Sequence, residues 1–488
     1  MKKIVLFITF ISLSISSCTD DITGLNELKK EATSTKPEYL FTNAQKNLAD
    51  QMVSTSVNYN VFRLFAQHWT ETTYPDESQY NITTRSIPDN HFTVLYRDVL
   101  RDLKESKTIL SAEVYVGTTA EKAAKELVRK NKLAVIDILT AYTYSILVDT
   151  FGNIPYTQAL DLENHPQPVY DDAKTIYKDL ITRLTSDVSN LSTSAESFGS
   201  ADLVYGGDVT QWKKFANTLR LRLAVNIYDV EPTYGKAQVE AAVTAGVIMN
   251  ASDNANFKYL STQPNTNPLY VDLVASGRHD FVPANTLVNK MNTLSDPRRE
   301  KYFTLASNGT YKGGTYGTGN SYSSNSHVSA TIEDPTLPGT LLDYTEVQFL
   351  LAEAVEKGAA ISGTAQSHYN AAITASMEQW GVTSAEITTY LARTDVAYTT
   401  ATGTYKQKIG EQAWIALYNR GFEAWTSYRR LDYPALAAPA GAYNGLTTVP
   451  VRYSYPAKEQ TLNTANVTAA TTAIGGNELT TKLFWDKF

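Results

Sequence analysis

The 488-residue chain has only one cysteine, Cys18. A lone cysteine excludes intramolecular disulfides and every zinc or iron–sulfur site built from several thiolates. The chain also lacks a basic excess, because its 43 Lys and Arg are outnumbered by 50 Asp and Glu and the net charge is -7. Nucleic acid is therefore not an expected partner. A mean hydropathy of -0.27 excludes a multi-span membrane protein, and 43% hydrophobic residues are typical of a folded chain.

Several enzyme motifs are missing as well. The sequence has no Gly-x-Ser-x-Gly, no His-Glu-x-x-His and no Gly-x-x-x-x-Gly-Lys loop. The short acidic pairs at 20–21 and 171–172 do not follow the spacing of a calcium loop. We therefore expect no catalytic residue, no cofactor and no metal, although 50 carboxylates leave room for a glycoside hydrolase pair.

The first residues form an export signal. Lys2 and Lys3 precede an apolar run, Ile4 to Ile15, that is too short to span a bilayer comfortably. Ile15-Ser16-Ser17-Cys18 then resembles a bacterial lipobox, in which the cysteine is acylated and becomes the mature N-terminus. The alternative is an ordinary secretory signal with a chance cysteine. We predict a signal peptide over 1–17, a lipidated flexible tether over 18–40 and one domain over 41–488, with Cys18 anchoring it to a membrane.

Apolar residues at helical spacing predict pairs of helices. The pairs cover about 122–149 with 171–191, 208–230 with 234–245, and a helix ending near 357 with 365–380. Asp171 and Asp208 are the predicted N-caps, and Trp212, Phe215, Leu219 and Leu223 are predicted core residues. The pairing resembles tetratricopeptide (TPR) packing, without a legible TPR consensus. Glu353, Glu423, Arg429 and Arg430 are predicted to pair their charges, or else to form a solvated face.

Four long segments carry turn residues instead of a helical period: 70–90, 250–283, 307–339 and 434–466. Loops of this length in a compact protein are usually functional or disordered. They are rich in tyrosine, of which the chain has 31, and this ring offers both an apolar face and a hydrogen-bonding hydroxyl. Tyr311, Tyr316 and Tyr322 are spread along one such loop, which is either a plain surface loop or a ligand-contacting one.

Five stretches, in a fixed order behind the lipobox, resemble a known family. They are Leu147 to Tyr156, Trp212 to Ala224, Tyr344 to Ala354, Trp414 to Arg430 and Pro450 to Pro456. Together they resemble the SusD/RagB-like nutrient-binding outer-membrane lipoproteins of the Bacteroidetes, in particular their shorter, divergent branch. The resemblance runs from about Ala44 to the C-terminus. Asp20 and Asp21 are similar to the surface-export signal of such lipoproteins, or are simply a solvated tail.

The resemblance implies a mainly α fold, with TPR-like helix pairs as a scaffold, long irregular loops and little β structure. Members of the family are binding proteins, not enzymes. They sit on the cell surface and capture oligosaccharides, or in some branches peptides, for SusC-like TonB-dependent transporters. We expect this function and an outer-membrane location facing the exterior. The alternatives are a TPR-like scaffold for surface assemblies that binds no small molecule, and a surface glycoside hydrolase.

The family's binding residues vary, so the candidate site depends on local chemistry. The first candidate combines Trp69 and Tyr74, which would stack on a ligand, with Gln67, His68 and Glu71, which would bind its hydroxyls. The alternative is a buried structural tryptophan. The second candidate is Tyr270 with Arg278, His279 and Asp280 as a polar rim, or else a salt-bridged loop.

Overall fold

The computed structural model describes residues 35–487. The predicted signal peptide, Cys18 and the acidic pair Asp20-Asp21 lie outside the described residues. One compact unit spans Pro37–Phe488, and its first helix, α3, begins at Pro37. This helix therefore includes the last four residues of the segment predicted to be a tether.

Helices dominate the described residues, and the strands are short, so the predicted mainly α fold is confirmed. The longer helices are α3 (Pro37–Val53), α6 (Arg101–Ala112), α7 (Thr119–Phe151), α8 (Ala173–Asn190), α9 (Val209–Ile227), α10 (Pro232–Ala245), α12 (Asn285–Thr293), α14 (Tyr344–Glu356), α15 (Ala365–Gln379), α16 (Ser384–Leu391), α17 (Tyr405–Ala416), α18 (Gly421–Leu431) and α20 (Thr464–Ala473). Short ones are α4 (Phe62–Phe65), α5 (Ile87–Thr93), α11 (Pro268–Tyr270), α13 (Arg299–Tyr302) and α19 (Ala457–Leu462), and two π-helical segments are η1 (Val94–Leu100) and η4 (Val271–Ala275).

The strands form three two-stranded antiparallel sheets. They are β1 (Trp69–Glu71) with β5 (Phe281–Pro283), β2 (Ile154–Pro155) with β3 (Tyr170–Asp171), and β4 (Ala255–Phe257) with β6 (Gly339–Leu342). Two of the sheets join segments distant in sequence, and β2 with β3 closes the connection between α7 and α8. The strands therefore fasten loops to one another instead of forming a core layer.

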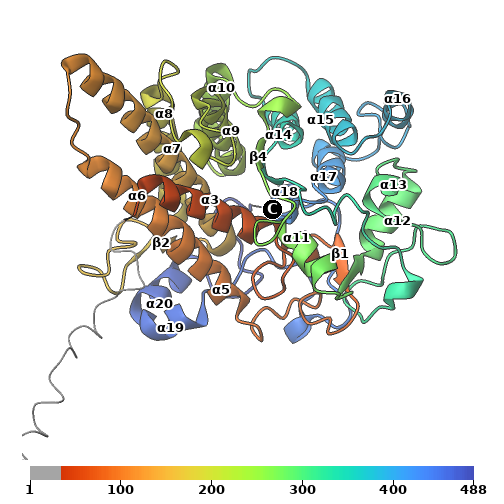
Figure 1. Cartoon of the computed structure of the whole chain (residues 1–488). Helices are drawn as coiled ribbons and strands as arrows, with labels where there is room; N and C mark the ends of the chain where they lie inside the picture. Colours follow the sequence, from red (N-terminus) through yellow and green to blue (C-terminus); the bar gives the residue numbers. More distant parts are fainter. Residues whose placement is uncertain (1–34, 488) are drawn as a thin grey trace, which may run out of the picture. The chain divides into compact units, whose positions relative to one another are not determined.

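The three predicted helix pairs are confirmed, since α7 packs on α8, α9 on α10 and α14 on α15. A fourth pair, α17 on α18, was not predicted. Successive pairs touch through α8 with α9, α9 with α14 and α14 with α17. Figure 1 shows α7 to α10, α14, α15 and α17 as neighbours along one side, with the long loops and β1 on the other. Helix α7 is long and apolar enough to span a membrane, but most of its apolar stretch is buried against these neighbours.

Side-chain caps fix several helix starts. The Asp208 carboxylate accepts hydrogen bonds from the backbone N–H groups of Thr210 and Gln211, as predicted. For α8, however, the cap is Asp172, so the prediction of Asp171 was wrong by one residue. Asp171 instead accepts bonds from the N–H groups of Tyr156 and Thr157, at 3.0 and 2.8 Å, and holds the loop after β2.

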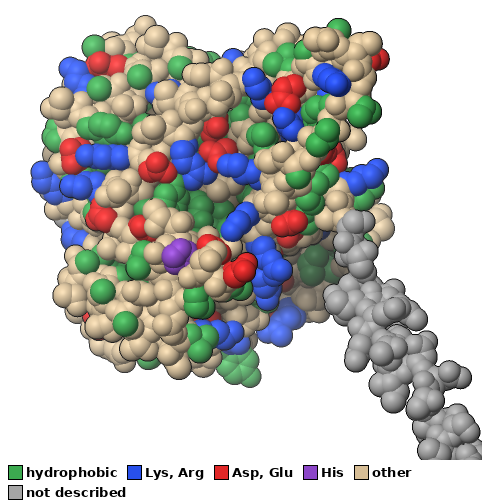
Figure 2. Space-filling view, turned by 90° about the vertical axis from the view of Figure 1, so that its left-hand side faces the viewer, with side chains coloured by type: hydrophobic (Ala, Val, Ile, Leu, Met, Phe, Trp, Pro, Cys, Tyr) green, Lys and Arg blue, Asp and Glu red, His purple; other side chains and the backbone are tan. Residues whose placement is uncertain are grey.

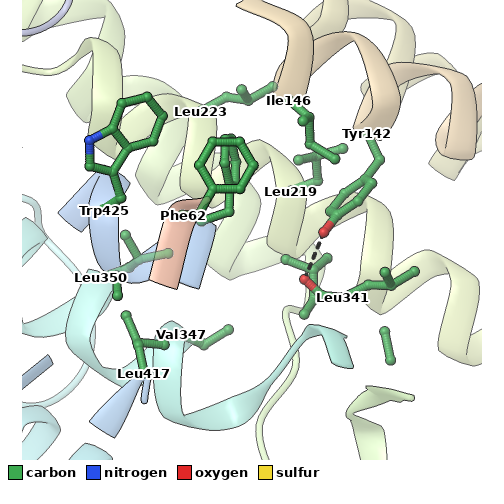
Figure 3. Close-up of a cluster of buried hydrophobic side chains, with 14 of the residues drawn as sticks. Phe62, Tyr142, Ile146, Leu219, Leu223, Leu341, Val347, Leu350, Leu417 and Trp425 are labelled. Carbon is green, nitrogen blue, oxygen red and sulfur yellow. Dashed lines mark hydrogen bonds between the residues drawn. The ribbon is translucent and has the colours of Figure 1, made fainter. Parts of the chain in front are cut away.

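The core lies where α7, α9, α14 and α18 meet. The predicted core residues of α9, from Trp212 to Leu223, are fully buried, which confirms that prediction. Figure 3 shows Leu219 and Leu223 of α9 near Tyr142 and Ile146 of α7, with the Tyr142 hydroxyl donating to the Leu341 carbonyl at 3.0 Å. Gly421 at the start of α18 lies against α4, since a Cβ there would be 2.6 Å from the backbone nitrogen of Arg63.

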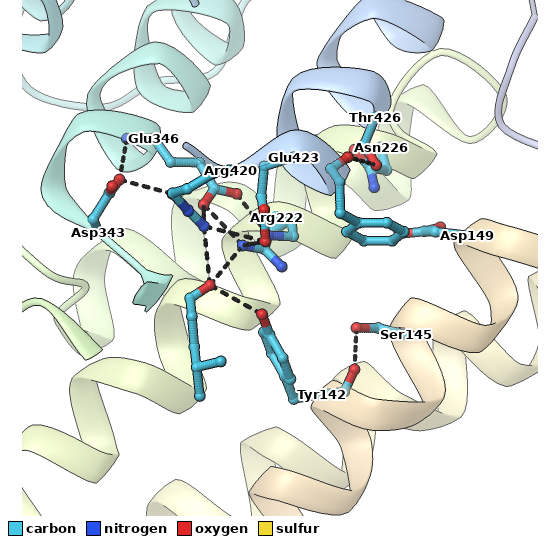
Figure 4. Close-up of polar contacts among 12 residues, drawn as sticks. Tyr142, Ser145, Asp149, Arg222, Asn226, Asp343, Glu346, Arg420, Glu423 and Thr426 are labelled. Atoms are coloured by element: carbon cyan, nitrogen blue, oxygen red, sulfur yellow. Dashed lines mark hydrogen bonds and ion pairs between the residues drawn. The ribbon is translucent and has the colours of Figure 1, made fainter. Parts of the chain in front are cut away.

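A buried ion network joins these helices (Figure 4). Arg222 of α9 makes two hydrogen bonds, 2.6 and 2.8 Å, to the Glu346 carboxylate of α14. The Arg420 guanidinium forms ion pairs with the carboxylates of Glu346, Asp343 and Glu423, at N···O distances of 2.7, 2.9 and 3.2 Å. Burial by itself raises the pKa of Glu346, but the two guanidinium groups outweigh burial and lower it to about 2. Glu423 receives weaker contacts, and burial raises its pKa.

The predicted charge pairing holds for three of four residues. Glu353 pairs with Arg430 at 3.0 Å and Glu423 belongs to the network above. Arg429 differs, because its guanidinium lies over the Trp425 ring at 3.4 Å and donates to the carbonyl oxygens of Asp149 and Val451. The prediction of a charge pair was therefore wrong for Arg429, whose charge is held by a ring and by peptide oxygens.

Candidate functional site

The two candidate segments of the sequence lie side by side. Strand β1 pairs with β5, so that Glu71 faces Phe281. Just beyond the strands, the Thr72 N–H donates to the Asp280 carbonyl at 2.8 Å and the Thr72 hydroxyl donates to the His279 carbonyl at 2.6 Å. The loops predicted around Tyr74 and Arg278 are thus one surface.

A third predicted loop joins them. The Asn320 backbone N–H donates to the Thr72 carbonyl at 2.8 Å, and its side-chain amide donates to the Glu71 carbonyl at 3.0 Å. Gly317 N–H donates to the Thr70 hydroxyl at 3.2 Å. We call the resulting surface the three-loop platform, and its members are Tyr74, Arg278, His279, Asp280, Tyr322, His327 and Glu333.

A stack of three rings forms the centre of the platform. The Tyr322 ring lies between the rings of His279 and His327. Its centroid is 4.1 Å from that of His279, with an interplanar angle of 19°, and 3.7 Å from that of His327, with an interplanar angle of 12°. His327 Nε2 is 2.9 Å from the Tyr322 carbonyl oxygen, which fixes the second imidazole. Glu333 lies near both histidines, since burial raises its pKa while His327 and His279 oppose the rise. The rings are therefore held in place by the protein.

Polar and exposed groups surround the stack. Tyr74 has 68% of its surface exposed and a left-handed backbone, with φ of 55°. Arg278 and Asp280 form an exposed ion pair, which raises the pKa of Arg278, and Tyr74 adds a smaller contribution. Aromatic rings can stack on the apolar face of a ligand ring while charged groups bind its hydroxyls. The platform therefore suits a ligand with both kinds of surface.

Trp69 does not contribute to this surface. It is 0% exposed, its indole N–H donates to the Tyr418 hydroxyl at 2.9 Å, and Arg63 lies 5.3 Å from its ring centroid. The prediction that Trp69 stacks on a ligand was therefore wrong, and the alternative of a buried structural tryptophan is correct. The cause is the contact with Tyr418, which is distant in sequence and covers the inner side of β1.

Three polar residues beside Trp69 are buried too, so the prediction that they bind ligand hydroxyls was wrong. The Gln67 amide donates to the Tyr80 hydroxyl and the Ala437 carbonyl, at 3.0 and 2.7 Å. His68 places its ring nitrogens 3.1 and 3.0 Å from two carbonyl oxygens, and burial lowers its pKa to about 3. Glu71 accepts two hydrogen bonds from Ser78. Each side chain fixes the fold under the platform.

Glu71 also forms a carboxyl pair with Glu77. Burial, followed by the hydrogen bond and charge of Glu77, raises the pKa of Glu71 to about 9, so Glu71 is protonated at neutral pH. Arg85 contacts Glu77 at 2.6 Å. Both carboxyl groups are buried, whereas a glycoside hydrolase needs two carboxyl groups that flank an accessible glycosidic bond.

Of the second candidate, Arg278 and Asp280 lie on the platform. Tyr270 is half-buried in α11, and no described contact joins it to the ring stack. His327 and Glu333 were not predicted as site residues. Their only signal is that they follow Tyr322 within the same long loop.

The molecule has clefts on other faces. One, of about 340 Å³, lies between α6, α7 and α8, and is lined by charged residues such as Lys107, Asp137 and Arg183 around apolar ones such as Leu103 and Ile136. Figure 2 shows that face, where acidic and basic side chains are mixed around hydrophobic patches. Within residues 35–487 no group of three His, Cys, Asp or Glu side chains is placed to hold a metal ion.

Comparison with known proteins gives a consistent set of matches. The family model SusD-like_2, described as starch-binding associating with outer membrane, matches residues 29–456. A solved chitin-binding protein is 26% identical, with a TM-score of 0.78 over 93% of this chain and all of its own. A SusD homologue from Bacteroides uniformis is 27% identical, with a TM-score of 0.77 over 92% of this chain and all of its own. A chitin-binding SusD homologue from Flavobacterium johnsoniae is 24% identical, with a TM-score of 0.77 over 92% of this chain and 99% of its own. No match is found among curated proteins.

Proposed function

Because the chain belongs to the SusD-like_2 family of outer-membrane-associated, starch-binding proteins, we propose that it captures an oligosaccharide on the three-loop platform and passes it to a SusC-like TonB-dependent transporter. The observation that supports this proposal is the ring stack of His279, Tyr322 and His327, with exposed Tyr74 beside it. Stacking adapts to successive sugar rings, while the Arg278–Asp280 pair and Glu333 provide hydrogen bonds for discrimination.

A shallow platform is consistent with delivery. A ligand that must be passed on has to dissociate, and a site open to water binds through contacts that water can replace. A lipid anchor at Cys18 would hold the domain near one transporter, so the local ligand concentration rises without tight affinity. The Glu71–Glu77 pair is buried, so we propose a binding protein without turnover.

The test is calorimetric titration of residues 19–488, which contain the whole compact unit, with maltoheptaose, chitotetraose and a panel of peptides. We expect binding to a saccharide without product release. Tyr74→Ala should weaken it about tenfold or more, on the scale of the roughly 1–3 kcal/mol that aromatic stacking contributes per base in single-stranded nucleic-acid sites. Tyr322→Ala should weaken it too, because it removes the ring that holds the two imidazoles in their stacked positions. Tyr39→Ala is the control, because Tyr39 is similarly exposed, at 64%, but lies on α3.

Each other result has a defined meaning. Saccharide binding that both tyrosine variants retain would refute the platform. Binding of peptides alone would change the ligand class. Release of shorter saccharides would favour the glycoside hydrolase alternative, and no binding by a folded protein that still forms surface complexes would favour the scaffold alternative.

A further inference from the structure

We propose that a second binding site, for a compact neutral polyhydroxylated ring such as a single sugar residue, lies in the cleft between α3, η1 and the α11–η4 segment. This site is separate from the three-loop platform. The inference rests on the proposed function only for the saccharide class of the ligand.

The cleft has a volume of about 310 Å³, at the lower end of the range of small-molecule sites. One wall is the C-terminal half of α3, with Asp50, and Ser54 directly after the helix, and the opposite wall includes Thr266 and Asp272. Figure 1 shows α11 beside the C-terminal end of α3. A ligand of one or two rings matches this size, whereas a long chain would have to leave the cleft.

Two polar atoms in the cleft have no partner within the described part of the chain. They are the hydroxyl oxygen of Thr266, a residue only 3% exposed, and Oδ2 of Asp272. Buried polar atoms are nearly always hydrogen-bonded in native proteins. Both residues line the cleft, but the surrounding protein covers these two atoms. A ligand hydroxyl that displaces the covering groups would meet an acceptor in Asp272 Oδ2 and both an acceptor and a donor in Thr266.

The balance of charge favours a neutral ligand. Asp50 is bound by Lys46 and by the Tyr259 hydroxyl, and Asp98 by Arg97. Burial raises the pKa of Asp272, while hydrogen bonds from the Thr55 backbone and the Ser54 side chain, and then the positive charge of Arg63, oppose the rise. Three carboxylates are thus matched by three cations, and an added ligand charge would be left without a partner.

Apolar groups form the rim of the cleft. Tyr59 is 42% exposed and Val271 39%, and Pro264 and Pro268 lie on the same border. An exposed ring beside free hydrogen-bonding atoms is the combination that binds the apolar face and the hydroxyl edge of a sugar. Asp272 also precedes Arg278 of the platform by only six residues, so the α11–η4 segment contributes to both sites.

The two sites can be measured separately. Because Cys18 is the only cysteine, residues 19–488 contain none, and a single introduced cysteine can carry an environment-sensitive fluorophore. Asn58→Cys places it beside Tyr59 at the cleft, and Ser323→Cys beside Tyr322 at the platform; both positions are exposed. The probes are glucose, N-acetylglucosamine, maltotetraose and chitotetraose.

We expect a sugar to change the fluorescence at Asn58→Cys, with a dissociation constant that Asp272→Asn raises about tenfold or more and Thr266→Val raises less. Neither substitution should alter the response at Ser323→Cys. Thr266→Val keeps the side-chain shape and removes an unpartnered hydroxyl, so this variant should fold even if Asp272→Asn does not.

The inference is overturned if the label at Asn58→Cys is silent with all four probes, or if its response is the same in Asp272→Asn and Thr266→Val as in the parent chain. A silent label at Ser323→Cys together with a response at Asn58→Cys would overturn the platform instead. The failure of one site is therefore distinguishable from the failure of the other.

Discussion

Removal of the Glu346 charge should destabilise the protein in a pH-dependent way. Glu346 is 7% exposed, and its carboxylate is bound by both Arg222 and Arg420. Glu346→Gln keeps the shape but leaves two buried guanidinium groups short of a counter-charge. Breaking a buried ion pair in this way costs about 3–5 kcal/mol.

The pKa of Glu346 gives a second, independent value for the stability that this charge contributes. The folded pKa of about 2 lies below the ordinary 4.5, so the charge stabilises the fold above pH 4.5 and the effect is lost as the pH falls towards 2. A shift of about 2.5 pH units corresponds to ~3 kcal/mol at pH 7. By the same linkage it falls to roughly 1.4 kcal/mol at pH 3.

The assay is urea unfolding of the parent chain and Glu346→Gln at pH 7 and pH 3, with thermal unfolding as a second readout. About 450 residues give an unfolding entropy near 1 kcal/mol per kelvin, so the midpoint should fall by roughly 3–5 °C at pH 7. Glu378→Gln, an exposed position on α15, is the control and should change stability by under about 0.5 kcal/mol. A loss that is as large at pH 3 as at pH 7 would refute the electrostatic reasoning.

Three further predictions concern other parts of the chain. The pKa of Glu71 is raised to about 9, so the contribution of this carboxyl group to stability is complete below pH 4.5 and is lost as the pH rises towards 9. Glu71→Gln should therefore raise the melting temperature relative to the parent chain at about pH 8–9 and not at about pH 5. Gly421→Val should lower the free energy of unfolding by about 1–3 kcal/mol, because its side chain would press on the backbone of Arg63; an unchanged urea midpoint would contradict this close contact. Cys18→Ser should move the protein from the membrane to the soluble fraction of fractionated cells, and retention in the membrane would exclude the lipid anchor.

Much of the fold follows from local sequence. The helix pairs were predictable because apolar residues recur at helical spacing and because Asp208 and the glycines at 358 and 381 mark helix ends. The family resemblance is confirmed by the family model. It was recognisable in Trp212 to Ala224 and Trp414 to Arg430 because these segments lie in the core, where packing restricts the choice of side chain. The lipid anchor, the transporter and the ligand stay predictions.

The site was predictable only in part. Tyr74, Arg278 and Asp280 lie on loops whose length and composition indicate exposure. The burial of Trp69 was not predictable, because the residue that covers it, Tyr418, lies 349 positions away. The ring stack likewise depends on β1–β5 pairing, which brings His279 to the loop of Tyr322, and strands of three residues have no readable period.

The contacts beneath the platform also determine when it can form. His68, Trp69 and Gln67 bind Trp414, Tyr418 and Ala437, at sequence separations of 346, 349 and 370 residues. Closing loops of that length costs conformational entropy before any contact is gained, so we expect these bonds to form late in folding. A chain that ends before residue 414 holds all the platform side chains yet lacks the support of β1. Ligand binding should therefore require the C-terminal part of the chain. A truncation before residue 414 should remove binding although it deletes no platform residue.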